Sequence, residues 1–297
     1  MIVVTAPTSM IGRQVLDHVL KGHEEVRVVV RDPSKLPLDV RQKVHLVEGS
    51  HGDPAVIDQA FRGADAVFWL SPPDPRADSV VAAYLDFTRP AAMSLRANGV
   101  KNVVGVSALG RGTAVAGRAG YVTASLAMDD MIAGTGTNYR ALTMPSFMDN
   151  LLRQTASIRN QGMFFSPISE DRKTPTCATR DIARVAAKLL TDRDWKGVEE
   201  RPVLGPEDLS FADMAGIISD VLGKTVRFQR ISGEAYKARL VHLGMSDAMA
   251  QGMLDMATAK DEGLDNGVTR TPEFSTPTSF DEWCQDMLKP EVLGRAA

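Results

Sequence analysis

Short apolar runs alternate with segments of helical spacing through the first half of the chain, and this alternation constrains the fold most. Ile2 to Thr5 and the β-branched run Val26 to Val30 are typical of strands buried on both faces of a parallel sheet. Between them, apolar residues recur at the spacing of a helix. Further strands are predicted at residues 44–47, 64–70 and 101–107, with helices near 11–20, 54–61 and 79–97. Repeated strand–helix units of this kind predict an α/β fold built on a doubly wound parallel sheet.

The rhythm changes beyond about residue 150 and predicts a second, smaller part of the protein. We expect residues 1–150 to form the doubly wound domain and residues 151–297 to form a smaller mixed α/β lobe that partly returns to the main body. Helices are predicted at 181–190, 211–222 and 234–243, with a short strand at 225–229. The Met-rich segment 245–256 is predicted to be helical, and its methionines either pack in a core or line an adaptable apolar pocket.

Composition limits the classes of partner. The chain has 297 residues, a formal net charge of -3 and a pI near 6.0, so it offers no long-range attraction to nucleic acid or to an anionic membrane surface. Cys177 and Cys284 lie outside any CxxC or CxxH motif, and the five histidines show no metal-ligand spacing, so we predict no metal site. Without a signal-like N-terminus or a long apolar run, a cytoplasmic protein is expected.

The segment Val3 to Gly12 reads Val-Val-Thr-Ala-Pro-Thr-Ser-Met-Ile-Gly and resembles a dinucleotide-binding turn with most of its glycines replaced. The three glycine positions hold Ala6, Ser9 and Gly12. Gly12 keeps the residue needed for close helix-to-strand packing, whereas Thr8 and Ser9 either donate hydroxyl hydrogen bonds to phosphate or cap the following helix. The turn follows a strand and opens a helix, which is the context that the motif requires.

Cationic residues follow the second predicted strand in the sequence Arg31-Asp32-Pro33-Ser34-Lys35. A carboxylate at the strand end would suit the ribose diol of NAD, whereas a guanidinium suits the 2′-phosphate of NADP. Arg31 takes the strand-end place, with Lys35 as support, so NADP(H) is the expected cofactor and NAD(H) the less favoured one. A solvated surface arginine is the alternative interpretation.

Several segments together resemble the NmrA-like family of atypical short-chain dehydrogenase/reductase proteins. They include Val28-Val29-Val30-Arg31-Asp32-Pro33-Ser34-Lys35, Gly63-Ala64-Asp65-Ala66-Val67-Phe68-Trp69-Leu70-Ser71-Pro72-Pro73, Val100-Lys101-Asn102-Val103-Val104-Gly105-Val106-Ser107-Ala108-Leu109-Gly110 and Pro145-Ser146-Phe147-Met148-Asp149-Asn150. The resemblance spans nearly the whole chain. It implies a Rossmann-like domain with a small substrate lobe, and either NAD(P)H-dependent reduction of quinones and related compounds or redox sensing without turnover.

The loops that end the predicted strands supply the expected cofactor contacts, together with the glycine-depleted turn. These contacts are Ala6, Thr8, Ser9, Met10, Ile11, Gly12, Arg31, Lys35, Leu70, Ser71, Pro72, Ser107, Pro145, Ser146 and Phe147.

The catalytic candidates are Tyr121, Ser107 and Ser125. Reductases of the wider superfamily use Tyr-x-x-x-Lys on one helical face, where the lysine lowers the tyrosine pKa so that the phenol can protonate a carbonyl oxygen. Here the helix reads Tyr121-Val-Thr-Ala-Ser125, so the spacing survives without the cation. Ser107 ends a strand at the place where a superfamily serine orients a substrate oxygen. Asp129 and Asp130, on the same helix, are expected to form a solvated face.

Three functions follow from these observations. The first is an NADPH-dependent oxidoreductase that transfers hydride to a small apolar quinone or conjugated carbonyl substrate, which needs little acid assistance. The second is an NADP-sensing regulatory protein without catalysis that presents a surface to a protein partner. The third is a non-redox enzyme for cyclisation or elimination on the same fold. A homodimer is compatible with each of them.

Overall fold

The chain forms two compact units in a computed structural model that describes residues 1–294. The first unit comprises Met1–Ala108, Ala124–Thr143 and Ile182–Arg201. The second comprises Leu109–Thr123, Met144–Asp181 and the chain from Pro202 onward. The chain thus passes repeatedly between the units. The boundary after residue 150 stays a prediction about where an independently folding domain would end.

A seven-stranded sheet forms the centre of the first unit. Its strands are β1 (Ile2–Thr5), β2 (Val26–Val30), β3 (His45–Glu48), β4 (Ala66–Trp69), β5 (Asn102–Ala108), β6 (Asn138–Met144) and β10 (Val198–Pro202). Their order across the sheet is β10-β6-β5-β4-β1-β2-β3, and β1 pairs in parallel with both β2 and β4. The predicted doubly wound α/β sheet is confirmed. The order reverses between β1 and β4, so a ligand crevice is expected beyond the carboxyl ends of these two strands.

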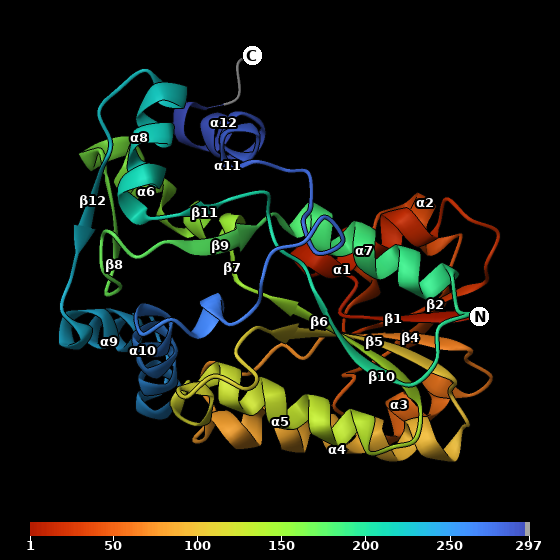
Figure 1. The fold of residues 1–297 in the computed structure, drawn as a ribbon. Coiled ribbons are helices and arrows are strands. Elements are labelled where there is room, and N and C mark those ends of the chain that lie inside the picture. Colours follow the sequence, from red (N-terminus) through yellow and green to blue (C-terminus); the bar gives the residue numbers. More distant parts are fainter. Residues whose placement is uncertain (295–297) are drawn as a thin grey trace. The chain divides into compact units, whose positions relative to one another are not determined.

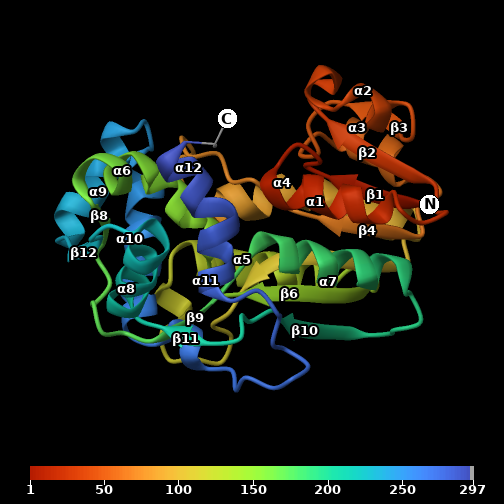
Figure 2. The same ribbon diagram turned by 90° about the horizontal axis from the view of Figure 1, so that it is seen from above.

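Helices cover both faces of this sheet. The helices are α1 (Met10–Val19), α2 (Leu38–Arg41), α3 (Pro54–Phe61), α4 (Val80–Ala97), α5 (Tyr121–Ala133) and α7 (Thr179–Thr191). Figure 1 shows α1 and α7 on one face and α3, α4 and α5 on the other, and Figure 2 shows α1 and α7 running along the strands that they cover. Ser79 starts α4 by accepting a hydrogen bond from the amide of Ala82. Buried residues of α3, α4 and α5 share one core cluster with strand residues such as Trp69 and Val103.

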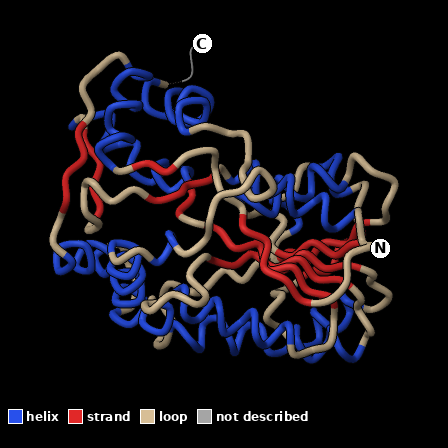
Figure 3. Tube along the Cα trace, viewed as in Figure 1, coloured by secondary structure: helices blue, strands red, loops and turns tan. Residues whose placement is uncertain are grey.

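The second unit is built on two small sheets. Strands β11 (Asp208–Leu209), β9 (Thr174–Cys177) and β7 (Ser146–Phe147) form one, and β12 (Arg227–Arg230) pairs in parallel with β8 (Met163–Ser166) to form the other (Figure 3). The helices are α6 (Thr155–Gln161), α8 (Phe211–Leu222), α9 (Gly233–His242), α10 (Asp247–Asp261), α11 (Phe280–Trp283) and α12 (Lys289–Leu293). The helices predicted at 211–222 and 234–243 are confirmed. Phe211 stacks on Phe228 at a centroid distance of 4.5 Å and joins α8 to β12.

The Met-rich segment is helical as predicted, and Met249 is fully buried, so at least this methionine packs in a core. Both cysteines, Cys177 and Cys284, are buried free thiols. Burial raises the pKa of each thiol above its ordinary value. Within residues 1–294, no helix is long and apolar enough to cross a bilayer. In the same range, no cluster of three or more His, Cys, Asp or Glu residues is placed to hold a metal ion.

Candidate functional site

The turn between β1 and α1 is tightly closed despite its missing glycines. Ala6 has a φ of 48°, a left-handed conformation that glycine adopts more readily than alanine. The Ser9 amide donates to the Ala6 carbonyl oxygen at 3.0 Å and closes the turn. A Cβ at Gly12 would lie only 2.1 Å from that same oxygen, so the close packing predicted for Gly12 is confirmed.

The amino end of α1 presents hydrogen-bond donors. Ser9 is its N-cap, and the Ser9 hydroxyl accepts from the Gly12 amide at 3.0 Å while keeping its own hydrogen to donate. Met10 and Ile11 are the first two helical residues, and their amides have no acceptor within the helix. Thr8 is exposed beside them. The turn therefore offers amide and hydroxyl donors to an anion, and the capping role is confirmed for Ser9.

The loop after β4 is fixed by two side chains. The Thr5 hydroxyl donates to the Phe68 carbonyl oxygen at 2.9 Å and accepts from the Leu70 amide at 3.1 Å. His51 Nε2 donates to the Leu70 carbonyl oxygen at 2.9 Å. The next residue, Ser71, has a buried Oγ without a hydrogen-bond partner within residues 1–294. A buried hydroxyl left in this state costs about 1–3 kcal/mol, so Ser71 fits a site that a polar ligand completes.

His51 is a residue of this edge that the sequence analysis missed. Its ring meets Trp69 and Phe87 edge to face, at centroid distances of 5.4 and 4.8 Å. Burial lowers the pKa of His51 to about 4, and the Arg31 guanidinium contributes in the same direction. His51 is therefore neutral near pH 7 and serves as a fixed donor to Leu70.

The carboxyl end of β2 carries exposed cations. Arg31 follows the strand directly, and Lys35 lies at the end of the short 3-10 helix Pro33–Lys35; both side chains are exposed. Asp32 Oδ1 accepts from the Ser34 hydroxyl at 2.6 Å and the Ser34 amide at 3.0 Å, and these hydrogen bonds hold the Asp32 pKa below its usual range. One oxygen of the carboxylate that could serve a ribose diol is thus engaged in its own turn. This arrangement favours a phosphorylated ribose.

A buried polar network lies at the end of β5. The Ser107 hydroxyl donates to Asp129 Oδ2, and the Tyr139 hydroxyl donates to Asp129 Oδ1 at 2.5 Å. Ser125 Oγ lies 3.4 Å from Ser107 Oγ, so the structure brings two of the predicted catalytic residues together. Asp129 is only 3% exposed. The prediction of a solvated face is therefore wrong for Asp129, because this side of α5 turns toward β5 and β6, whereas Asp130 is exposed.

Gly105 makes room for this network. A Cβ at Gly105 would lie 2.2 Å from the Tyr139 hydroxyl oxygen. Any larger residue at position 105 would therefore displace the Tyr139 side chain, whose hydroxyl donates to Asp129. The glycine in the sequence Val-Val-Gly-Val-Ser is the signal from which the network could have been found.

Tyr121 and the segment Pro145–Phe147 belong to the second unit. Tyr121 begins α5, four residues before Ser125. Burial raises the pKa of Tyr121 to about 12, and Tyr236 in the same unit contributes. Ser146 and Phe147 form β7, and both are partly exposed. The roles of these residues toward cofactor and substrate stay predictions.

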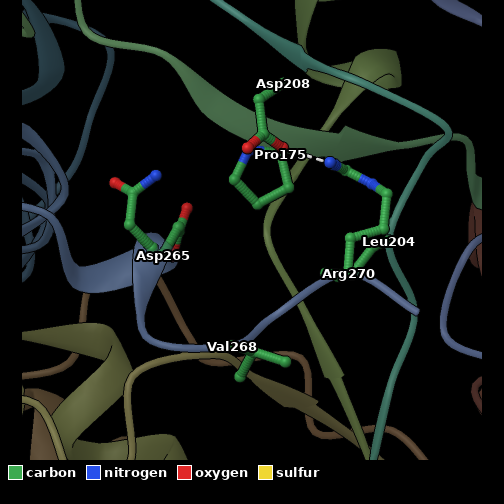
Figure 4. Close-up of a pocket in the computed structure, with 7 residues that line it drawn as sticks. Pro175, Leu204, Asp208, Asp265, Val268 and Arg270 are labelled. Atoms are coloured by element: carbon green, nitrogen blue, oxygen red, sulfur yellow. Dashed lines mark hydrogen bonds and ion pairs between the residues drawn. The ribbon is translucent and has the colours of Figure 1, made fainter.

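Two hollows lie away from the predicted site residues. A cavity of about 50 Å³ in the second unit is lined by residues including Asp208, Asp265 and Arg270; Figure 4 shows the ion pair between Arg270 and Asp208. This volume suits a few water molecules rather than an aromatic substrate. A hollow of about 350 Å³ in the first unit is lined by the turns around Gly99 and Gly136. It adjoins the amino ends of β5 and β6, opposite the end that carries Ser107.

The model of the NmrA-like family matches residues 1–284. The chain belongs to the NmrA-like family. The resemblance seen in the sequence is thereby confirmed, and with it the expectation of a Rossmann-like sheet at the centre of the molecule.

Two relatives and one solved structure illustrate what the chain is similar to. An NAD(P)H azoreductase of Xenophilus azovorans is 27% identical over 256 residues, which cover 86% of each chain. Quinone oxidoreductase 2 of Escherichia coli is 23% identical over 283 residues, covering 94% of this chain and 95% of the relative. The crystal structure of an NADPH-dependent quinone oxidoreductase of Escherichia coli complexed with NADPH matches with a TM-score of 0.78 at 21% identity, covering 95% and 98% of the two chains.

Proposed function

We propose that this protein is an NADPH-dependent reductase of small apolar quinones or conjugated carbonyl compounds. The observation that carries the proposal is the set of unfilled donors and cations at the carboxyl ends of β1, β2 and β4: the capped turn at Ser9, the buried hydroxyl of Ser71 and the exposed guanidinium of Arg31. The quinone and azo reductases among the relatives support the substrate class.

The cofactor-binding residues divide by chemistry. The amides of Met10 and Ile11 and the hydroxyl of Ser9 would hold the diphosphate, because a helix N-terminus favours an anion. Arg31, with Lys35, would pair with the 2′-phosphate, to which a guanidinium can donate two parallel hydrogen bonds. The other predicted contacts on this edge are Ala6, Thr8, Gly12, Leu70, Ser71, Pro72 and Ser107. The nicotinamide of the bound cofactor would supply the hydride.

The residues proposed to contact the substrate oxygen are weak acids. Tyr121, whose pKa is about 12, stays protonated near neutrality and can donate a hydrogen bond to a substrate oxygen, but it is a poor base. Reduction of a quinone consumes one hydride and one proton and yields the hydroquinone. The negative charge that hydride addition creates on a quinone is delocalised, so this substrate class needs no strong acid. That property suits a chain with Ser125 at the position of the usual lysine.

The same substitution favours a second candidate function. A protein that binds NADP and signals its presence to a protein partner has no need of an activated tyrosine. The raised pKa of Tyr121 and the neutral Ser125 fit such a regulator as well. Turnover distinguishes the two candidates.

The decisive experiment is titration calorimetry of NADPH and NADH with the wild-type protein and with Arg31→Ala, followed by an assay of NADPH oxidation with a panel of quinones and enones. Loss of one charge-assisted, bidentate contact should weaken NADPH binding by about tenfold to a hundredfold and leave NADH nearly unchanged. Lys43→Ala is the matched control, because Lys43 is an exposed cation just before the amino end of β3.

Each outcome has a distinct meaning. NADPH binding that depends on Arg31, with oxidation by a quinone, supports the reductase. NADPH binding without oxidation by any acceptor supports the regulator and rejects the reductase. If neither nucleotide binds, both candidates are wrong and the cofactor-free alternative takes their place.

A further inference from the structure

The direction of one hydrogen bond decides what Ser107 can offer a ligand. Asp129 accepts from Ser107 through Oδ2 and from Tyr139 through Oδ1, so each carboxylate oxygen receives one hydroxyl hydrogen. A carboxyl oxygen that receives a hydroxyl hydrogen acts as the acceptor in that contact. The Ser107 hydrogen is thereby committed to Asp129, and its oxygen keeps its lone pairs for other donors.

This direction conflicts with the role expected from the superfamily pattern. A serine that orients a substrate carbonyl must donate to it, whereas Ser107 donates toward the interior. A second hydroxyl, that of Ser125, lies 3.4 Å away, at the position where the superfamily carries its lysine. Because the Ser107 hydrogen points to Asp129, Ser125 is the donor in that contact and Ser107 the acceptor.

Burial and close packing hold these four side chains in place. Asp129, Ser107, Ser125 and Tyr139 are 3%, 6%, 5% and 1% exposed, so water does not compete strongly for these hydrogen bonds. Gly105 leaves the space that the Tyr139 hydroxyl needs. Ser107 also lies near the carboxyl end of β5, the edge at which ligands of doubly wound sheets bind.

We propose that Asp129 is a positioning residue that fixes Ser107 as a hydrogen-bond acceptor for the nicotinamide half of the bound dinucleotide. The Ser107 oxygen would accept a hydrogen bond from a ribose hydroxyl or from the carboxamide N–H of that half. The inference rests on the proposed binding of NADPH but not on turnover. Asp129 acts through Ser107 and does not itself touch the ligand.

The test compares two probes by titration calorimetry: NADPH, and adenosine 2′,5′-bisphosphate, which lacks the nicotinamide half. Ser107→Ala and Asp129→Asn should each weaken NADPH binding about tenfold, the value of roughly one hydrogen bond, and change binding of the shorter probe less than twofold. Ser107→Thr keeps the hydroxyl and should recover most of the affinity.

A double-mutant cycle separates positioning from structural support. If Asp129 acts only through Ser107, the variant carrying both Ser107→Ala and Asp129→Asn should bind NADPH as Ser107→Ala does. Asn102→Ala is the stability control, because Asn102 is buried at the opposite end of β5 and should lower the melting temperature without changing NADPH affinity. If Asp129→Asn does not fold, Asp129→Glu, which shifts the carboxylate by one methylene, should show the same pattern.

The inference is overturned if Asp129→Asn binds NADPH like the wild type, if the two losses add, or if both probes weaken equally. Wild-type protein that binds NADPH without oxidising it in the presence of any acceptor contradicts the reductase proposal but leaves this inference intact. If the wild type oxidises NADPH normally and the variants bind NADPH as the wild type does, the reductase proposal stands and this inference is wrong. Absence of NADPH binding by the wild type overturns both.

Discussion

Gly12 lies so close to Ala6 that a Cβ on Gly12 would come within 2.1 Å of the Ala6 carbonyl oxygen. At Gly12 the first helix therefore approaches the backbone that follows β1 too closely for a side chain. Of the three positions at which the glycine motif expects glycine, this is the one where the chain keeps it. The Ala6 position tolerates its Cβ at the cost of a left-handed φ of 48°.

Gly12→Ala should destabilise the protein and weaken NADPH binding together, because the helix and the turn would have to separate. Overpacking of this kind costs about 1–3 kcal/mol of unfolding free energy. Urea denaturation measures the first effect and NADPH titration the second. Gly216→Ala is the matched control, since Gly216 lies in α8, where an added methyl group would point into open space, and this change should gain up to about 1 kcal/mol. A Gly12→Ala variant as stable as the wild type would contradict the close packing.

Ser71→Ala should separate stability from binding. Its buried Oγ lacks a hydrogen-bond partner among the described residues, so removing it should stabilise the free protein by up to about 1 kcal/mol while weakening NADPH binding about tenfold. Thr88→Val is the control, because Thr88 also has a buried hydroxyl without a partner there, but it lies within α4. Thr88→Val should stabilise the free protein without changing its affinity for NADPH. Equal NADPH affinity of Ser71→Ala and wild type would remove Ser71 from the site.

The buried His51 should make stability depend on pH between about 6.5 and about 4. Its folded pKa of about 4 lies below the ordinary 6.5, so the unfolded chain takes up the proton first as the pH falls. Unfolding free energy should therefore decrease through this window, by on the order of 3 kcal/mol, and this contribution should level off below it. His51→Gln keeps a donor for Leu70 and should flatten the curve, whereas the exposed His45→Gln should not. Denaturation across the window measures both slopes.

Gly105→Ala should displace Tyr139 from Asp129, because the added Cβ would lie 2.2 Å from the Tyr139 hydroxyl oxygen. A loss of about 1–3 kcal/mol of unfolding free energy is expected. Tyr139→Phe removes the oxygen that makes the shortest contact but leaves ring carbons at 2.8 and 2.9 Å. Combining the two changes should therefore cost less than the sum of the single changes. Strict additivity in urea denaturation would show that the glycine and the tyrosine are not coupled.

The sheet and its helices were predictable because their signals are local. The run Val26 to Val30 matches β2 residue for residue, and the helix predicted at 211–222 is α8. Element ends were less predictable: the apolar run 64–70 contains β4, but β4 itself spans only Ala66–Trp69. A strand ends where pairing ends, and hydrophobicity alone does not show that.

The polar network could not be read from its residue types. Asp129 stands next to Asp130, and paired carboxylates on a helix usually face water. Its partners Ser107 and Tyr139 lie 22 and 10 residues away in sequence, on two different strands, so only the tertiary fold joins them. The β1–α1 turn was easier to predict from the sequence, because Ser9 and Gly12 lie only three residues apart. The roles of Tyr121 and of Pro145 to Phe147 stay predictions.

The two buried cysteines have a consequence for a protein that handles quinones. Quinones are electrophiles that alkylate thiolates, and the thiolate is the reactive form of cysteine. Cys177 and Cys284 are both fully buried, and burial raises the pKa of each thiol. The folded protein is therefore shielded from covalent self-inactivation by the very class of compound that it is proposed to reduce.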